Sequence, residues 1–361
     1  MPKIMHVVGA RPNFMKVAPV MAAMDKRPGL FQQVLVHTGQ HYDYVMSQVF
    51  FEELRMPEPD EYLNVGSGSH AQQTAHVMLA FEPVLLSQQP DWVIVVGDVN
   101  SSLACALVCS KAGIPVAHVE AGLRSGDRSM PEEINRLLTD QIADLLFTPS
   151  RDADAHLLRE GCDPSKIHLV GNVMIDTLVS LLPQAQARPI LADLGLQKGQ
   201  YVLVTLHRPV NVDHPEVLRE ILAALDEISQ DIPVIFPVHP RTRETLNQHG
   251  LASARIRFLQ PQGYLDFLAL TDAAGAVITD SGGIQEETTY LGVPCLTVRT
   301  TTERPVTVTL GTNRLVASER QAILDSFSGV SLGQRGGGKI PELWDGHAAE
   351  RIVEVMAAQV I

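Results

Sequence analysis

The chain has 361 residues, of which 41 are Asp or Glu and 28 are Lys or Arg, so its formal net charge is −13 with the histidines neutral. This acidic average argues against a protein that binds nucleic acid or an anionic membrane surface, because both partners require a basic face. Hydrophobic residues make up 45% and charged residues 19%, which is typical of globular rather than disordered proteins, and the length predicts two domains.

The cysteines and the apolar segments predict a cytoplasmic protein with neither a metal site nor a membrane span. No CxxC pair and no histidine at zinc-site spacing accompanies the four cysteines, Cys105, Cys109, Cys162 and Cys295. The apolar run near the first residue is too short for a signal peptide. No stretch approaches the length of about 20 apolar residues that spans a bilayer.

Short, mostly β-branched apolar runs alternate with amphipathic segments along the first half of the chain. The runs predict buried strands at 4–8, 34–36, 92–96, 116–119 and 145–148. The segments with helical spacing predict helices at 15–24, 71–86, 103–112, 134–142 and 152–160. Such an alternation is typical of a parallel sheet with helices on both faces.

The same alternation begins again in the second half. Strands are predicted at 201–206, 234–237, 256–259, 276–279 and 295–298, and helices at 215–229, 241–249, 264–274, 283–291 and 347–361. We therefore predict an α/β protein with two Rossmann-like, doubly wound domains that face a cleft. Residues 1–175 form the first domain, 176–345 the second, and 346–361 a helix that packs back on the first.

Charged residues follow the strands of the first half. Arg11 and Lys16 flank the start of a helix, where an anion is favoured, although both could be solvated cations. Asp98 follows the third strand, where it could also serve as a helix cap. Glu120 ends the fourth strand, a position at which a carboxylate is costly unless it is paired or functional.

Further along, the segment MPEEINR opens a helix and carries Glu132 and Arg136. These two residues are four apart and share a helix face, so a surface ion pair is the simplest interpretation of their spacing.

In the second half, His207 and His239 each follow a strand, where packing or capping is the commoner role for a histidine. The segment TDSGGIQEE gives a stronger signal, because backbone N–H groups of Ser281, Gly282 and Gly283 can approach a phosphate at a helix start. One helical turn further, Glu287 could accept hydrogen bonds from ribose hydroxyls, and Arg304 follows the next strand as another cation.

Taken together, these motifs resemble one enzyme family. GARPNFMK, GDVNSSLA, HVEAGLRS, MPEEINR, VTLHRP, PVHPRT, TDSGGIQEE and TTERPVT occur in the order and approximate spacing of the non-hydrolysing UDP-N-acetylglucosamine 2-epimerases. The resemblance implies a glycosyltransferase-B-like fold, a homodimer, a UDP-sugar as substrate and no cofactor. It also implies reversible inversion at C2, which interconverts UDP-GlcNAc and UDP-ManNAc for surface polysaccharides.

The resemblance also implies roles for individual residues. Asp98, Glu120 and Glu132 match the family's carboxylates at the sugar, and His207 is expected to take part in catalysis. The uracil is expected near Gln262 and Phe267, and the ribose at Glu287. The diphosphate and its surroundings are expected to be bound by His207 together with Arg11, Lys16, Ser281, Gly282, Gly283 and Arg304. Arg136 and His239 are expected to bind the substrate. These cations at strand ends would reverse the acidic average locally.

Two departures from the family pattern leave alternatives open. Asn13 stands where many members carry Glu, and the segment HRPVNVD, 207–213, differs from the usual HRREN form. The first difference concerns the pairing near Arg11. The second, in a family that includes epimerases for related substrates, leaves UDP-2,3-diacetamido-glucuronate as an alternative substrate. A glycosyltransferase, a hydrolysing epimerase and a non-catalytic UDP-sugar sensor are further hypotheses.

Overall fold

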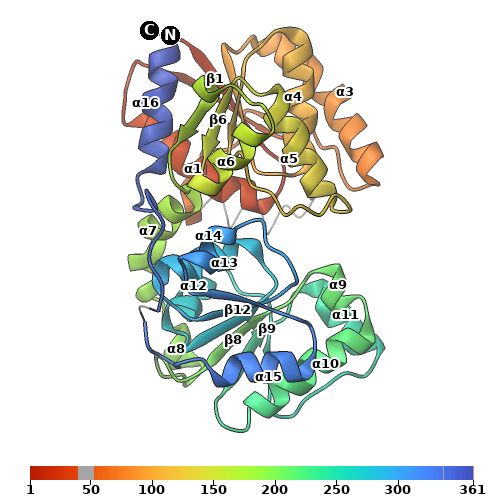
Figure 1. The fold of residues 1–361 in the computed structure, drawn as a ribbon. Helices are drawn as coiled ribbons and strands as arrows, with labels where there is room; N and C mark the ends of the chain where they lie inside the picture. Colours follow the sequence, from red (N-terminus) through yellow and green to blue (C-terminus); the bar gives the residue numbers. More distant parts are fainter. Residues whose placement is uncertain (40–52, 336, 361) are drawn as a thin grey trace. The chain divides into compact units, whose positions relative to one another are not determined.

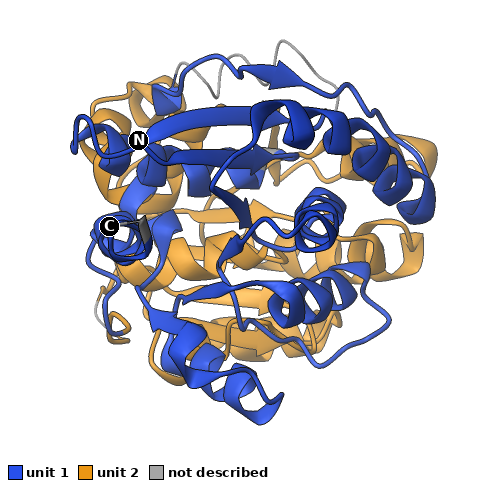
Figure 2. Ribbon diagram, turned by 90° about the horizontal axis from the view of Figure 1, so that it is seen from above, with its two compact units in different colours: residues 1–177, 342–361 blue, residues 178–341 orange. Residues whose placement is uncertain are grey.

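The computed structural model describes residues 1–39, 53–335 and 337–360 and divides the chain into two compact units, coloured separately in Figure 2. Unit 1 comprises residues 1–177 and 342–361, and unit 2 comprises residues 178–341. The chain passes from unit 1 to unit 2 within one helix, α7 (Val173–Gln186).

Unit 1 contains a seven-stranded parallel sheet in the order β3-β2-β1-β4-β5-β6-β7. Figure 1 labels two of these strands, β1 and β6. Its strands are β1 (Lys3–Val8), β2 (Gln32–His37), β3 (Glu61–Tyr62), β4 (Trp92–Val96), β5 (Val116–Val119), β6 (Leu145–Thr148) and β7 (Ile167–Leu169). The helices are α1 (Arg11–Asp25), α3 (His70–Gln88), α4 (Asn100–Ala112), α5 (Pro131–Ile142), α6 (Arg151–Arg159), the short η1 (Pro164–Lys166) and α16 (Ala348–Val360).

Alternate residues of β1 explain why helices cover both faces of this sheet. Ile4 and Val8 pack into one core with residues of α1 and α16, whereas Met5 and Val7 pack into a second core with residues of α3 and α4. Because successive side chains of a strand point to opposite faces, an apolar run buries both faces at once. The sheet is therefore covered on both sides, as the sequence predicted.

Unit 2 repeats the plan with a six-stranded parallel sheet in the order β10-β9-β8-β11-β12-β13. The strands are β8 (Val202–Thr205), β9 (Val234–Pro237), β10 (Arg257–Leu259), β11 (Ala276–Thr279), β12 (Cys295–Val298) and β13 (Asn313–Val316). The helices are α8 (Ile190–Asp193), α9 (Pro209–Val212), α10 (Pro215–Ile228), α11 (Pro240–Gln248), α12 (Tyr264–Ala273), α13 (Gly282–Leu291), α14 (Pro305–Thr309) and α15 (Arg320–Ser328).

The α/β fold class and all ten predicted strands are confirmed, and the structure adds β3, β7 and β13. No helix within the described ranges is long and apolar enough to cross a lipid bilayer.

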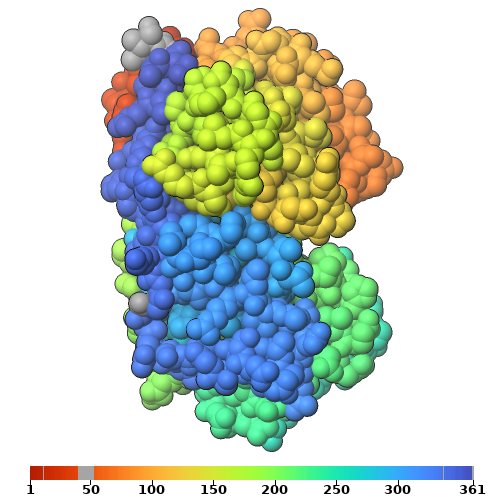
Figure 3. Space-filling model, in the orientation of Figure 1, coloured from red at the N-terminus to blue at the C-terminus, as the bar shows by residue number. Residues whose placement is uncertain are grey.

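The last helix belongs to unit 1, and in the space-filling view α16, in dark blue, forms part of that unit's surface (Figure 3). The backbone N–H groups of Ala348 and Ala349 donate to the carboxylate of Asp176 at 3.1 and 2.7 Å. The indole N–H of Trp344 donates to the carbonyl oxygen of Pro149 at 2.9 Å. These bonds fasten the returning chain to unit 1 just after it leaves unit 2.

Candidate active site

Strand order reverses once in each sheet, between β1 and β4 in unit 1 and between β8 and β11 in unit 2. Open α/β sheets bind ligands beyond the carboxyl ends of the strands at this position. In unit 1 the turns that begin at Gly9 and Gly97 lie there, and in unit 2 those that begin at Leu206 and Asp280. Candidate residues predicted from the sequence lie in or next to these turns.

In unit 1, Lys16 and Glu120 form a buried ion pair between α1 and the end of β5. Glu120 has a positive φ of 71°, a conformation that a side chain rarely adopts without a structural or functional reason. Gly97 lies beside this pair, and a Cβ added to it would come 2.8 Å from Lys16 Nζ and 3.2 Å from Glu120 Oε2. The glycine thus allows the cation and the carboxylate to approach the turn that carries Asp98.

Asn13 joins the turn after β1 to the end of β4. Its side-chain oxygen accepts hydrogen bonds from the N–H groups of Gly9 and Ala10 at 3.2 and 2.9 Å, and its amide nitrogen donates to Val96 O at 3.0 Å. A carboxylate could accept the first two bonds but could not donate the third. The amide at this position therefore has a structural role. Arg11 begins α1, and its side chain lies outside the described part of the structure.

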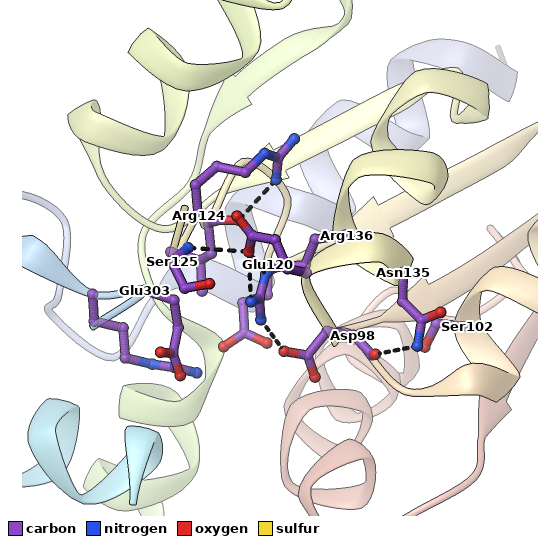
Figure 4. Close-up of polar contacts among 12 residues, drawn as sticks. Asp98, Ser102, Glu120, Arg124, Ser125, Asn135, Arg136 and Glu303 are labelled. Atoms are coloured by element: carbon purple, nitrogen blue, oxygen red, sulfur yellow. Dashed lines mark hydrogen bonds and ion pairs between the residues drawn. The ribbon is translucent and has the colours of Figure 1, made fainter. Parts of the chain in front are cut away.

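Asp98 and Arg136 form an ion pair, in which the arginine side chain is buried and the aspartate is 29% exposed (Figure 4). The neighbouring Asn135 donates to the backbone oxygen of Asp98 at 2.8 Å. Arg136 also donates from Nε and Nη2 to one oxygen of Glu133, at 3.0 and 2.7 Å. Helix α5 therefore holds the Asp98 turn through two adjacent residues, while Glu132 lies half-buried in its first turn.

Glu133 was not among the residues selected from the sequence, although it is three positions from Arg136 and can share its helix face. Its carboxylate accepts the N–H groups of Ser125 and Gly126 at 3.0 and 2.9 Å. Burial alone would raise the pKa of Glu133, but the bond from Ser125 and the Arg136 guanidinium lower it below its ordinary value. Glu133 is thus an ionised anchor between α5 and the loop that follows β5.

In unit 2, Asp280 organises the turn that carries His207. Its fully buried carboxylate accepts the backbone N–H groups of His207 at 3.1 Å and Arg208 at 2.9 Å, and the Asn211 amide at 3.1 Å. The His207 ring nitrogen Nδ1 lies 3.0 Å from Asp280 Oδ1, and the ring centroid lies 5.7 Å from that of His239. Sequence analysis missed Asp280, although it directly precedes the candidate phosphate turn.

The glycine turn begins α13 with Ser281 as N-cap and Gly282 as the first helical residue. The first N–H groups of any helix have no partner within it, so Gly282 and Gly283 present donors suited to an anion. A Cβ added to Gly282 would lie 2.6 Å from Arg304 Nη1 and 2.8 Å from Glu303 Oε1. The turn is therefore packed directly against a charged pair.

Arg304 lies within a buried cluster of arginines and glutamates. Its Nη1 is 2.6 Å from Glu303 Oε1 and its Nε is 2.7 Å from Glu286 Oε1. Arg299 and Arg208 approach Glu303 at 2.8 and 3.5 Å. Burial would raise the pKa of Glu303, but the charges of Arg304 and Arg299 hold it well below the ordinary value. Three guanidinium groups thus face two carboxylates beside the turn.

Glu287 is buried in α13 and accepts the hydroxyl of Tyr264 at 3.0 Å. Burial is the main reason that its pKa rises to about 7. Its second oxygen, Oε2, has no hydrogen-bond partner among the described residues. A buried acceptor of this kind suits a hydroxyl-bearing ligand. Gln262 and Phe267, both half-buried, lie at the start of α12 near Tyr264 in sequence.

The structure brings the candidates together in two groups. In unit 1, Lys16, Asp98, Glu120 and Arg136 meet around Gly97 and α5. In unit 2, His207 meets His239, and Gly282 meets Arg304. Lys16, Arg136 and Arg304 each form an ion pair with a carboxylate, and sequence analysis predicted none of these three pairs, which join Glu120, Asp98 and Glu303 to them in that order. Within the described ranges, no group of three or more His, Cys, Asp or Glu residues is placed to hold a metal ion.

Comparisons with known proteins show which family the chain is similar to. A family model described as UDP-N-acetylglucosamine 2-epimerase matches residues 22–357. A UDP-N-acetylglucosamine 2-epimerase homolog of Methanococcus maripaludis is 46% identical over 333 residues, covering 90% of this chain and 92% of its own. The UDP-2,3-diacetamido-2,3-dideoxy-D-glucuronate 2-epimerase of Pseudomonas aeruginosa is 43% identical over 358 residues, covering 98% and 99%.

The chain is also similar to a solved structure along nearly its full length. The crystal structure of Methanocaldococcus jannaschii UDP-GlcNAc 2-epimerase in complex with UDP-GlcNAc and UDP superposes with a TM-score of 0.91 at 42% identity, covering 99% of both chains.

Proposed function

Because the chain belongs to the UDP-N-acetylglucosamine 2-epimerase family, we propose that it catalyses the reversible inversion of UDP-GlcNAc at C2 to give UDP-ManNAc. The observation that carries this proposal is the extent of the similarity, which runs through both units. The enzyme is accordingly an isomerase that acts on a sugar nucleotide.

The chemistry of the substrate sets the order of events. The C2 proton of a pyranose has no neighbouring carbonyl to acidify it, so direct removal has a prohibitive barrier. In the mechanism that we propose, the C1–O bond to UDP breaks first, UDP leaves with the electron pair, and the positive character at C1 acidifies C2–H. A base then takes the proton and leaves a glycal. Return of a proton to the other face of C2 and re-addition of UDP at C1 complete the inversion.

Departure of UDP places negative charge on the diphosphate, and the groups of unit 2 suit that charge. We propose that the N–H groups of Ser281, Gly282 and Gly283 bind the diphosphate, assisted by Arg304 and His207. Asp280 would orient the His207 turn, because it holds two of its backbone N–H groups. Glu287 would accept ribose hydroxyls through Oε2, which has no hydrogen-bond partner among the described residues.

Loss of UDP also creates positive charge on the sugar, and unit 1 supplies carboxylates for it. We propose that Asp98, Glu120 and Glu132 stabilise that charge and carry the C2 proton. Lys16 and Arg136 would position Glu120 and Asp98, since each forms an ion pair with its carboxylate. Arg11, His239, Gln262 and Phe267 complete the proposed substrate contacts.

UDP-2,3-diacetamido-glucuronate is the second candidate substrate. The Pseudomonas aeruginosa relative named for that sugar is similar to this chain along nearly its full length. The two substrates share the C2 chemistry and differ at C3 and C5, so the same carboxylates would serve both reactions.

Proton NMR of a panel of UDP-sugars in D₂O tests the proposal directly. Incubation with the enzyme should exchange the C2 proton of the true substrate for deuterium and produce its C2 epimer. Binding of UDP-GlcNAc without C2 exchange would refute this sugar as substrate, and exchange with the diacetamido-uronate would then identify the alternative. Release of free ManNAc would instead indicate a hydrolysing enzyme.

The proposal extends to a cytoplasmic homodimer that supplies surface polysaccharide synthesis, as the family resemblance implies. Sedimentation equilibrium of the purified chain measures its oligomeric state, and a monomer at micromolar concentration would refute the dimer.

A further inference from the structure

A fully buried histidine in the centre of unit 1 uses both of its ring nitrogens. His118 lies on β5, and its Nδ1 is 2.6 Å from Asp140 Oδ1 on α5. Its Nε2 is 2.9 Å from the backbone carbonyl oxygen of Gly97. Neither His118 nor Asp140 has a role in the function proposed above.

The partners of the ring determine where its protons lie. A neutral imidazole has one N–H group and one lone pair, and a carbonyl oxygen can only accept. If Nε2–H donates to Gly97, a neutral ring would direct its Nδ1 lone pair at Asp140, which would then have to be protonated. Asp140 is an acceptor on its other side as well, because Oδ2 accepts Gly122 N–H at 3.0 Å and lies 2.7 Å from Arg124 Nη2.

The Arg124 guanidinium, 2.7 Å from Asp140 Oδ2, favours the ionised form of Asp140 and therefore a charged ring. Burial would raise the pKa of Asp140, but the charges of His118 and Arg124 lower it below its ordinary value. Among the described residues, Arg124, from the loop after β5, pairs with Asp140, and Glu160, the C-cap of α6, binds Arg124 at 2.6 and 2.8 Å. The Lys16–Glu120 ion pair lies beside Gly97 and is balanced in itself. When the His118 ring is charged, it and Arg124 are matched by the carboxylates of Asp140 and Glu160. This matters because an unmatched charge is costly in a buried region.

The His118–Asp140 pair binds both turns that carry proposed sugar carboxylates. Gly97, with a φ of +64°, directly precedes Asp98, and its carbonyl is bound by the ring. Gly122, with a φ of +80°, follows Glu120 by two residues, and its N–H is bound by Asp140. The pair therefore fixes the separation of two left-handed turns whose side chains must act together.

We propose that His118 is a positioning residue which, as an imidazolium paired with Asp140, holds Asp98 and Glu120 in their working arrangement through the Gly97 carbonyl. This inference deepens the proposed function and rests on it for the activity measurements, whereas the charge of the ring can be measured independently.

A second buried histidine provides an internal control in the same sheet. His6 lies on β1, is also fully buried, and its Nε2 is 2.9 Å from Gln33 Oε1. Its Nδ1 has no hydrogen-bond partner among the described residues, and burial is the main cause that lowers its pKa to about 4. His6 should therefore be neutral where His118 is charged.

Nitrogen NMR of the full chain labelled with ¹⁵N-histidine tests the charge. At about pH 7, where an unperturbed histidine is mostly neutral, both ring nitrogens of His118 should carry protons and only one of His6 should. The His118→Gln and His6→Gln variants assign the two sets of signals by their loss. One protonated and one unprotonated nitrogen in His118 would overturn the proposal.

Steady-state kinetics of C2 exchange tests the positioning role. His118→Gln removes the charge, and kcat should fall about a hundredfold because a misplaced reacting group has that effect, while KM changes less than about threefold. Asp140→Asn keeps an acceptor for Gly122 and can donate to Nδ1, so a neutral ring still donates to Gly97. This variant should lose about tenfold in kcat, since a charged donor is the stronger one.

The His6→Gln control should keep kcat within about twofold, because His6 contacts neither turn. Thermal melting establishes that each variant is folded. If His118→Gln and Asp140→Asn both retain kcat within about threefold of the wild type, the positioning role is wrong. Absence of C2 exchange in the wild type would instead refute the proposed substrate, and the NMR measurement would still decide the charge of His118.

Discussion

Substitution of Asp280 by alanine should loosen the turn that carries His207 without disturbing the rest of unit 2. Four donors converge on this carboxylate: the backbone N–H groups of His207 and Arg208, the Asn211 amide and the His207 ring. Alanine removes the acceptor for all of them and leaves the surrounding strands β8 and β11 unchanged.

The size of the local destabilisation in Asp280→Ala follows from the burial of these donors. A buried donor that loses its acceptor costs about 1 to 3 kcal/mol, and water can replace the carboxylate at the His207 ring, whose side chain is 42% exposed. The Arg208 N–H and the Asn211 amide are less accessible, so we expect about 3 to 5 kcal/mol of local destabilisation. At about 1.4 kcal/mol per factor of ten, even the lower value accelerates local opening about a hundredfold.

Hydrogen exchange at the amides of His207 and Arg208 measures this opening. Exchange in Asp280→Ala should be at least about a hundredfold faster than in the wild type, while Asp231→Ala, which alters an exposed residue of the same unit, should have no effect. A change of less than about threefold at Arg208 would refute the assignment of Asp280 as the anchor of this turn.

The stability that the Asp280 carboxylate contributes should change with pH in a defined direction. Burial would raise its pKa, but the His207 ring, the Arg208 N–H and the Asn211 amide lower it on balance. A carboxyl group with a lowered pKa in the folded state contributes stability above its unfolded value of about 4, and that contribution disappears as the pH falls. The difference in exchange between the wild type and Asp280→Asn should therefore shrink in acid.

Three further predictions concern single positions. Gly97→Ala should lower stability by about 1 to 3 kcal/mol and should also lower kcat, because the φ of +64° disfavours a side chain and the new Cβ meets Lys16 and Glu120. Urea unfolding measures the change in stability, and C2 exchange measures the change in kcat. Unchanged values for both would contradict the close packing around Gly97. Asp176→Asn should remove a pH dependence of stability, because burial raises the pKa of Asp176 to about 6 in the folded protein. The stability of the wild type relative to the variant should therefore fall by about 3 kcal/mol between about pH 4 and pH 7. Melting temperatures of the two proteins that change in parallel with pH would disprove this. Gly282→Ala should weaken UDP binding about tenfold or more in calorimetry and also lower the melting temperature, because its Cβ would meet Arg304 Nη1 and Glu303 Oε1. An unaltered Kd would exclude the glycine turn as the anion site.

The sequence predicted the interior of both sheets more completely than their edges. Central strands such as β4 and β11 are buried on both faces and therefore appear as uninterrupted apolar runs. The missed strands β3, β7 and β13 each lie at the edge of a sheet, and β13 includes the exposed Arg314. An edge strand has one neighbour and is partly exposed, so its residues give no continuous apolar signal.

Partners of the charged residues could not be predicted in the same way. Sequence analysis placed Asp98 and Glu120 at strand ends because parallel strands carry their functional residues there. It assigned Lys16 and Arg304 to an anionic ligand, whereas the structure places each against a carboxylate. A buried cation requires such a partner, and the partner can come from any element that packs nearby.

The sequence by itself determined the α/β class, the order of strands and helices and the strand ends at which chemistry is expected, since these depend on local apolar periodicity and on turn residues. Only the tertiary structure decided that Asp280 binds His207 across 73 positions, that Arg136 binds Asp98 across 38, and that His118 meets Asp140. Hydrogen bonds between distant residues depend on how elements pack, and no local pattern in the chain encodes that packing.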